Sequence, residues 1–155
     1  MTTQHISYVC TKHEVLMIMI GVLIVTHLDF GHKLLETAEG IVGQQEGCLA
    51  LSLDAGHNME TALAEIKQGL KKLDSGDGVL VLTDMFGGTP SNISLSLLGT
   101  GKLEVITGAN LPMLLKIFSA RCSTPLEDLA LEAKSAGRQG ILVAGEVLKR
   151  KIANE

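Results

Sequence analysis

Residues 79–90 read Val79-Leu-Val-Leu-Thr-Asp-Met-Phe-Gly-Gly-Thr-Pro90, an apolar run that passes directly into a glycine-rich turn. An uninterrupted apolar run of this length is typical of a central parallel strand covered by helices on both faces. The run Ile20-Gly-Val-Leu-Ile-Val25 has the same character. Two further short runs, Cys48–Leu53 and Leu103–Thr107, also predict strands.

Helical periodicity separates these runs. Apolar residues recur at spacings of three and four behind Asn58, which can cap the helix that they predict: Leu63, Ile66, Leu70 and Leu73. Lys71 and Lys72 stand near the expected end of this helix, where the helix dipole favours cations. Leu34, Leu35, Ala38, Ile41 and Val42 form a similar stripe.

Two Thr-Pro pairs predict further helix starts. Thr89 and Thr124 each precede a proline, as expected of a cap residue before the first helical position, and Thr124 with Glu127 forms a capping box. A last apolar run, Ile141–Leu148, predicts a fifth strand. Alternating strands and helices predict an α/β fold, an open and mainly parallel sheet with helices on both faces. A flavodoxin-like order, 2-1-3-4, makes the first and third strands neighbours.

The composition predicts one compact domain. The chain has 155 residues, of which 46% are hydrophobic and 19% charged, and these proportions argue against disorder. Only 3% are aromatic and the formal charge is −4, so we expect no nucleic-acid binding. We assign residues 19–150 to a single domain, residues 1–18 to an N-terminal extension and residues 151–155 to a tail.

The sequence favours a cytoplasmic protein without membrane insertion. The apolar run Val15–Val25 is too short to cross a bilayer, and no small-residue cleavage site follows it. The cysteines Cys10, Cys48 and Cys122 stand singly, which favours a reducing compartment over a disulfide framework.

The candidate chemistry lies where two strands end. Ligands of open α/β sheets collect beyond the carboxyl ends of the strands, and there the sequence places His27 and Asp84. If Asp84 accepts a hydrogen bond from Nδ1 of His27, Nε2 keeps its lone pair and can act as a nucleophile for a phosphoryl group. A single histidine after a strand is usually an ordinary loop residue. A functional site is favoured because His27 and Asp84 are both expected at the carboxyl edge of the sheet.

The turn after Asp84 offers backbone amides to a phosphoryl group near a helix N-terminus. The candidate phosphoryl-binding residues are Thr26, Gly87, Gly88, Thr89, Ser91 and Asn92. A Gly-Gly turn alone is a weak signal. We expect no metal and no cofactor, because the remaining histidines have no metal-ligand spacing and no nucleotide-binding loop is present.

Three segments together resemble a known family. Thr26-His27, Leu82-Thr-Asp-Met-Phe-Gly-Gly-Thr-Pro-Ser-Asn92 and Gly108-Ala-Asn-Leu-Pro-Met-Leu114 are similar, in order and spacing, to the IIA component of the mannose-type sugar phosphotransferase system. The resemblance implies a phosphotransferase in which His27 is phosphorylated by the phosphocarrier HPr, oriented by Asp84, and passes the group to a IIB component during sugar uptake. It also implies a homodimer that exchanges an antiparallel fifth strand. We expect the IIB acceptor to be a separate polypeptide.

The chain departs from the family pattern beside the histidine. Leu28 stands where the family commonly has glycine, and Asp29 adds negative charge, although Asp29 is also a plausible N-cap of the next helix. Three alternatives stay open: a regulatory phosphoprotein not coupled to transport, a module that merely holds an anion, and the phosphocarrier subunit of dihydroxyacetone kinase. The sugar is not encoded in these residues.

Overall fold

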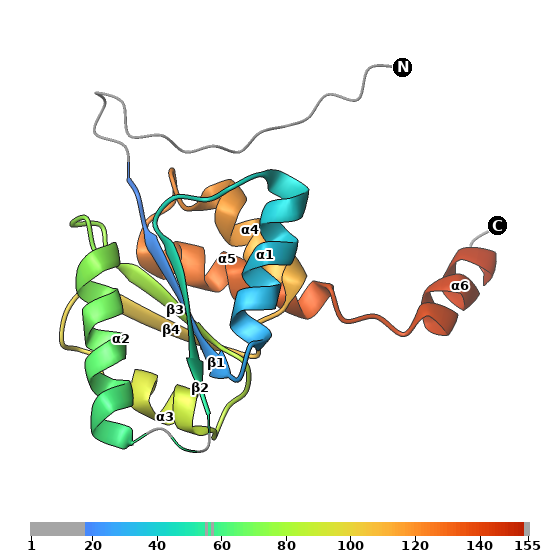
Figure 1. Ribbon diagram of the computed structural model, residues 1–155. Coiled ribbons are helices and arrows are strands. Elements are labelled where there is room, and N and C mark those ends of the chain that lie inside the picture. The colour runs from blue at the N-terminus through green and yellow to red at the C-terminus, as the bar shows by residue number, and fades with distance from the viewer. Residues whose placement is uncertain (1–17, 55, 57, 154–155) are drawn as a thin grey trace.

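The computed structural model describes residues 18–54, 56 and 58–153, except for the side chains of residues 150, 151 and 153. A four-stranded sheet lies between two layers of helices (Figure 1). Its strands are β1 (Gly21–His27), β2 (Cys48–Leu53), β3 (Val79–Thr83) and β4 (Leu103–Thr107). All pairs are parallel, and the order β2-β1-β3-β4 confirms the predicted order. The predicted extension, residues 1–18, lies outside the described residues except for Ile18.

The helices divide between the two faces of the sheet. One face is covered by α1 (Phe30–Val42), α4 (Leu111–Ala120) and α5 (Leu126–Gln139), and the other by α2 (Met59–Leu73) and α3 (Thr89–Ser96) (Figure 1). Successive side chains of a strand point to opposite faces, so β1 contributes to both cores. Val22 and Ile24 pack toward α1 and α4, whereas Leu23 and Val25 pack toward α2. This two-sided burial explains why the β1 run is apolar without alternation.

The helix caps follow the sequence only in part. Asn58 caps α2 as predicted, and its side chain accepts a hydrogen bond from the Glu60 amide. The predicted caps Thr89 and Thr124 are both wrong, because α3 is capped by Gly88 and α5 begins only after Pro125. Thr124 lies in the turn that follows α4, and its amide donates to the carbonyl of Ala120, the last residue of that helix, at 3.0 Å.

The predicted fifth strand, Ile141–Leu148, is also wrong. Residues 141–143 have no regular structure, and α6 spans Ala144–Ala153. The segment leads away from the sheet (Figure 1), and it pairs with no strand among the residues that the structure describes. A helix satisfies its own backbone groups where a strand requires a partner. The apolar residues that suggested a strand, Ile141 to Val143 among them, are exposed.

Candidate active site

His27 and Asp84 meet at the carboxyl edge of the sheet. His27 is the last residue of β1, and Asp84 follows the end of the neighbouring strand β3. Nδ1 of His27 lies 2.7 Å from Oδ2 of Asp84, and the His27 backbone amide donates to the same oxygen at 2.9 Å. The Met85 amide donates to the other carboxylate oxygen at 2.9 Å. Three contacts therefore hold the carboxylate in one orientation against the imidazole.

The environment of Asp84 determines which nitrogen of the imidazole carries the proton. Partial burial raises the pKa of Asp84, but the hydrogen bonds from the His27 amide and imidazole and from Met85 outweigh it, so the net pKa is lowered. An ionised carboxylate can only accept, and we therefore place the proton on Nδ1. Nε2 then keeps its lone pair. The His27 side chain is 43% exposed, and no described residue makes a hydrogen bond to Nε2.

Gly88 lies directly against the imidazole. A Cβ atom added at Gly88 would stand 2.6 Å from Cε1 and 3.1 Å from Nε2 of His27. Both distances are closer than ordinary van der Waals contact, so a side chain here would displace the ring. Gly88 is also the N-cap of α3, so the positive end of the helix dipole lies beside Nε2.

Two predicted phosphoryl-binding groups are already engaged within the fold. The Thr26 side chain is fully buried, and its hydroxyl accepts a hydrogen bond from the Gly31 amide at 2.8 Å. The Gly87 amide donates to the Ser91 hydroxyl at 3.0 Å. Thr26 and the Ser91 side chain therefore hold the β1–α1 and β3–α3 loops in place.

The remaining candidates differ in what their amides do. The Asn92 amide donates to the Gly88 carbonyl at 2.9 Å, as the first intrahelical bond of α3. Pro90 has no amide hydrogen, which leaves the amides of Gly88, Thr89 and Ser91 at the helix start. These three amides at the start of α3 can be offered to an anion.

The sequence singles out Leu28 as a departure from the family pattern, and the structure adds that its backbone is left-handed. Its φ angle is 49°, the left-handed region, and it is the only non-glycine residue with positive φ among the described residues. Its amide donates to the Leu53 carbonyl at 3.2 Å and so continues the β1–β2 ladder while the chain turns into α1. This conformation costs a leucine about 1–2 kcal/mol. Asp29 is the N-cap of α1 as expected, but its side chain makes no capping bond and lies 3.5 Å from Nδ1 of His32.

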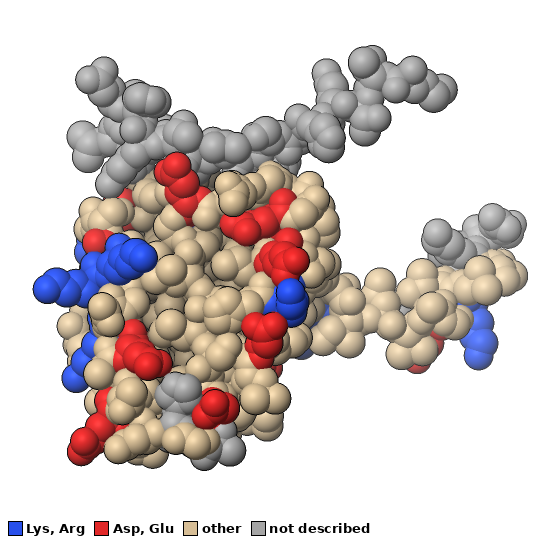
Figure 2. Space-filling view, viewed as in Figure 1, with Lys and Arg blue, Asp and Glu red and all other residues tan. Residues whose placement is uncertain are grey.

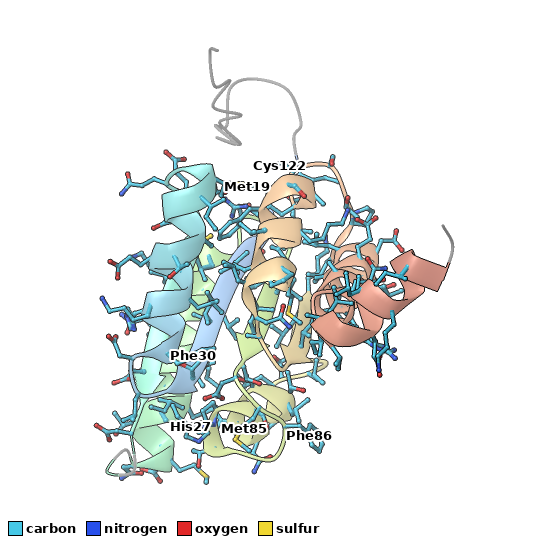
Figure 3. The ribbon with its side chains drawn as sticks, turned by 90° about the vertical axis from the view of Figure 1, so that its right-hand side faces the viewer. Met19, His27, Phe30, Met85, Phe86 and Cys122 are labelled. Atoms are coloured by element: carbon cyan, nitrogen blue, oxygen red, sulfur yellow. The ribbon has the colours of Figure 1, made fainter. Side chains whose placement is uncertain are left out.

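Four exposed apolar side chains surround the His27 end of the molecule, and we call them the apolar rim: Leu28, Phe30, Met85 and Phe86. Figure 3 shows Phe30, Met85 and Phe86 at the same end as His27, whereas Met19 and Cys122 lie at the other end. Leu28, Met85 and Phe86 lie in the loops that follow β1 and β3, and Phe30 is the first residue of α1. No periodic pattern in the sequence signals their exposure. Phe86 is 73% exposed and Leu28 66%.

The described residues contain no group of three side chains suited to hold a metal ion. Within the same part of the chain, no helix combines the length and apolar character needed to cross a bilayer. His32 lies on the exposed side of α1, and His57 falls outside the described residues.

Comparison with known proteins places this geometry in a family. Residues 21–134 match the family model for the PTS system fructose IIA component. The chain is 34% identical over 139 residues to the fructose-specific EIIA component of Bacillus subtilis, covering 88% of this chain and 95% of that protein. It is 37% identical over 124 residues to the mannose-specific EIIAB component of Escherichia coli K12, covering 79% of this chain but only 38% of that protein.

Solved structures agree with the sequence relatives. The EIIA component from Streptococcus agalactiae superposes with a TM-score of 0.76 at 29% identity, covering 83% of this chain and 99% of that one. The IIA protein associated with the fucose utilization operon of Streptococcus pneumoniae superposes with a TM-score of 0.74 at 30% identity, covering 84% and 97%. The matched residues include both His27 and Asp84, and the chain therefore belongs to the mannose and fructose family of IIA components of the sugar phosphotransferase system.

Proposed function

We propose that this protein is a phosphocarrier of sugar uptake that accepts a phosphoryl group on Nε2 of His27 from HPr and passes it to a IIB component. The observation that carries the proposal is the 2.7 Å contact between Nδ1 of His27 and Asp84, with Nε2 left unpartnered among the described residues. Membership of the family supports the partners and the sugar-uptake setting. A cytoplasmic location is part of the same proposal.

The transfer is a balanced exchange of two phosphorus–nitrogen bonds. The Nε2 lone pair of His27 attacks phosphorus in line, the bond from phosphorus to the donor imidazole breaks, and that imidazole leaves with the bonding electron pair. His27 then carries a positive ring with its proton still on Nδ1, and the Asp84 carboxylate stabilises this charge at 2.7 Å. Because the broken and formed bonds are alike, the site has to position the groups rather than drive the reaction.

The amides at the start of α3 supply the second part of the site. Gly88 lies against the edge of the ring that carries Nε2, and the amides of Gly88, Thr89 and Ser91 are not used inside the helix. Oriented amides of this kind stabilise the equatorial oxygens of a phosphoryl group in transit. The phosphoryl-binding role is therefore assigned to these three amides.

Replacing the nucleophile tests the proposal directly. We expect His27→Ala to abolish labelling by radioactive phospho-HPr, with an acid-labile and base-stable label in the wild type. The matched control is His32→Ala, which removes the neighbouring histidine on α1 and should label normally. Labelling of His27→Ala at the wild-type rate would overturn the assignment.

Passage to a IIB protein separates transport from regulation. A labelled wild-type chain should lose its label to a IIB component of the same family when the two are mixed. Label that is taken up but never released to any IIB protein would favour the regulatory alternative. If the wild-type chain takes up no label, the phosphocarrier and regulatory functions are excluded, and the remaining alternative is a module that holds an anion.

We also propose that the chain forms a homodimer through its C-terminal arm, residues 141–153. The arm leads away from the rest of the chain (Figure 1). Its apolar residues are exposed: Ile141, Leu142, Val143, Val147, Leu148 and Ile152. Such exposure is typical of a surface that a second subunit covers. Light scattering should give twice the chain mass, and truncation after Gly140 should give a monomer. A full-length chain that remains monomeric at high concentration would contradict the dimer.

A further inference from the structure

Leu28 combines two unfavourable features at one position. Its backbone is left-handed, with a φ of 49°, a conformation that leucine rarely adopts. Its side chain is 66% exposed, so it contributes little to the core in return. Backbone strain that the fold does not compensate locally is concentrated at functional sites. The position of Leu28, directly after His27, points to a role in what happens at that histidine.

The surroundings of Leu28 are apolar and open. The apolar rim presents four exposed side chains around the end of the sheet that carries His27, as Figure 3 shows for Phe30, Met85 and Phe86. An exposed apolar cluster of this kind marks a surface that another molecule covers. Transfer between two imidazoles brings the partner's ring in line with Nε2, so the surface around the partner's histidine must contact the rim.

The charge around the rim indicates the chemistry of that partner. The loops that carry the site, residues 26–30, 53–60 and 83–92, contain Asp29, Asp54, Glu60 and Asp84 but no lysine or arginine. In Figure 2 the basic side chains gather mainly higher up, over α2, whereas acidic ones reach the lower end of the face in view. A protein that carries a phosphoryl group to this face therefore needs basic side chains around an apolar centre.

We propose that Leu28 is a specificity-determining contact for the phosphoryl-donor protein. The left-handed backbone holds the leucine in the apolar rim, and the apolar centre of the donor surface buries it while basic residues of the donor meet the acidic loops. The inference rests on the proposed phosphocarrier function and adds to it the residue that selects the donor. Leu28 acts by contact with the donor protein, and it takes no part in the chemistry at Nε2.

The test compares a protein donor with a small one. Phospho-HPr must touch the rim to reach Nε2, whereas phosphoramidate is small enough to reach Nε2 without touching it. For Leu28→Ala we expect KM for phospho-HPr to rise about tenfold, the typical loss for removing one well-buried contact, with kcat nearly unchanged. Labelling by phosphoramidate should keep the wild-type rate.

A second variant separates the side chain from the backbone. Leu28→Gly removes the same side chain and also relieves the left-handed strain, so its KM should rise as in Leu28→Ala, while its thermal midpoint should not fall. Ile41→Ala is the matched control, because Ile41 is an exposed apolar residue on α1 roughly 16 Å along the helix from Phe30. This control should leave KM for phospho-HPr unchanged.

Each other outcome counts against the inference. An unchanged KM in both Leu28 variants overturns it, and so does a change confined to Leu28→Gly, which would assign the effect to the backbone. Slower labelling by phosphoramidate would mean that Leu28 acts on His27 itself. A wild-type chain that takes no label from either donor removes the proposed function, and the inference with it. If the wild type labels normally and the Leu28 variants keep its KM, the inference about Leu28 fails while the proposed function stands.

Discussion

The polar groups at the two ends of the sheet differ in burial and in hydrogen bonding. At the carboxyl end, His27 is half exposed, Nε2 has no partner among the described residues, and the apolar rim faces solvent. At the amino end, Arg121 is fully buried. Its Nη2 donates to the Glu46 carbonyl at 2.6 Å and to Gln45 Oε1 at 3.2 Å, and its Nη1 donates to the Ile20 carbonyl at 3.4 Å.

The surroundings of Arg121 are those of a structural group. The guanidinium lies 5.5 Å from the centre of the Phe118 ring, a distance at which a cation and an aromatic face attract. Nearby, burial raises the pKa of the Cys48 thiol to about 11, so the thiol stays protonated at neutral pH. Both terminal nitrogens of Arg121 have acceptors within the chain, although its buried Nε has no partner among the described residues. At the other end, Nε2 of His27 is left for a partner molecule. The difference teaches that a structural charged group is buried with hydrogen-bond partners, whereas a reactive group is exposed and keeps one atom without a partner.

The largest effect that tests this comparison is expected at the amino end. Arg121→Ala leaves a cavity and unpaired carbonyls, so we expect the free energy of unfolding in urea to fall by about 4 kcal/mol. The exposed Arg138→Ala on α5 is the control and should change stability by less than about 0.5 kcal/mol. A loss below about 1 kcal/mol in Arg121→Ala would contradict the structural role.

The next effect concerns the tautomer at the carboxyl end. Asp84→Asn can present an amide donor to Nδ1 and so move the imidazole proton to Nε2, which blocks the nucleophile. We expect the rate of labelling by phosphoramidate to fall on the order of 100-fold. Asp29→Asn makes the same chemical change at an exposed carboxylate two residues from His27 and should label at the wild-type rate. Equal rates in the two variants would refute the orienting role of Asp84.

Gly88→Ala tests how closely the backbone must approach the ring. The new Cβ atom would stand 2.6 Å from Cε1 of His27, so the ring must leave its contact with Asp84. We expect phosphoramidate labelling to slow by about tenfold, with little change in stability because the ring can swing into solvent. Gly101→Ala adds a methyl group in open space and serves as the control. Wild-type labelling of Gly88→Ala would show that the ring tolerates displacement.

The smallest effect is the acid dependence of stability. The pKa of Asp84 is lower in the folded chain than its ordinary value of about 3.9, so the unfolded chain binds the proton more readily. The stabilisation from Asp84 is therefore present above that ordinary value and is lost as the pH falls through the lowered pKa. We expect the difference in unfolding free energy between the wild type and Asp84→Asn to shrink on acidification. A difference that grows would contradict the direction of the shift.

Much of the fold could be predicted because local patterns and packing agree. The runs that form β1 and β3 are apolar on both faces since two cores bury them, and Asn58 caps α2 through its own side chain. The meeting of His27 with Asp84 also followed from sequence, because parallel strands that are neighbours end at one edge. Their roles in phosphoryl transfer remain predictions.

Other features depended on contacts that local patterns do not contain. Thr124 has the sequence of a cap, yet the preceding helix uses its amide. Residues Ile141–Leu148 have the apolar content of a strand, but no strand in the described part of the chain pairs with them, and α6 begins at Ala144 instead. Thr26 is a predicted phosphoryl-binding residue, but the sequence does not show that its hydroxyl accepts a hydrogen bond from the Gly31 amide.

Residue types and their spacing alone determined the strands, most helices and the pair of reactive groups, because a strand buried on both sides and an amphipathic helix each leave a periodic trace in the chain. The tertiary structure decided which side chains are satisfied and which are exposed. Whether Arg121 is buried, whether Leu28 is strained and which amides remain available all depend on residues distant in sequence, and only their arrangement in space brings these residues together.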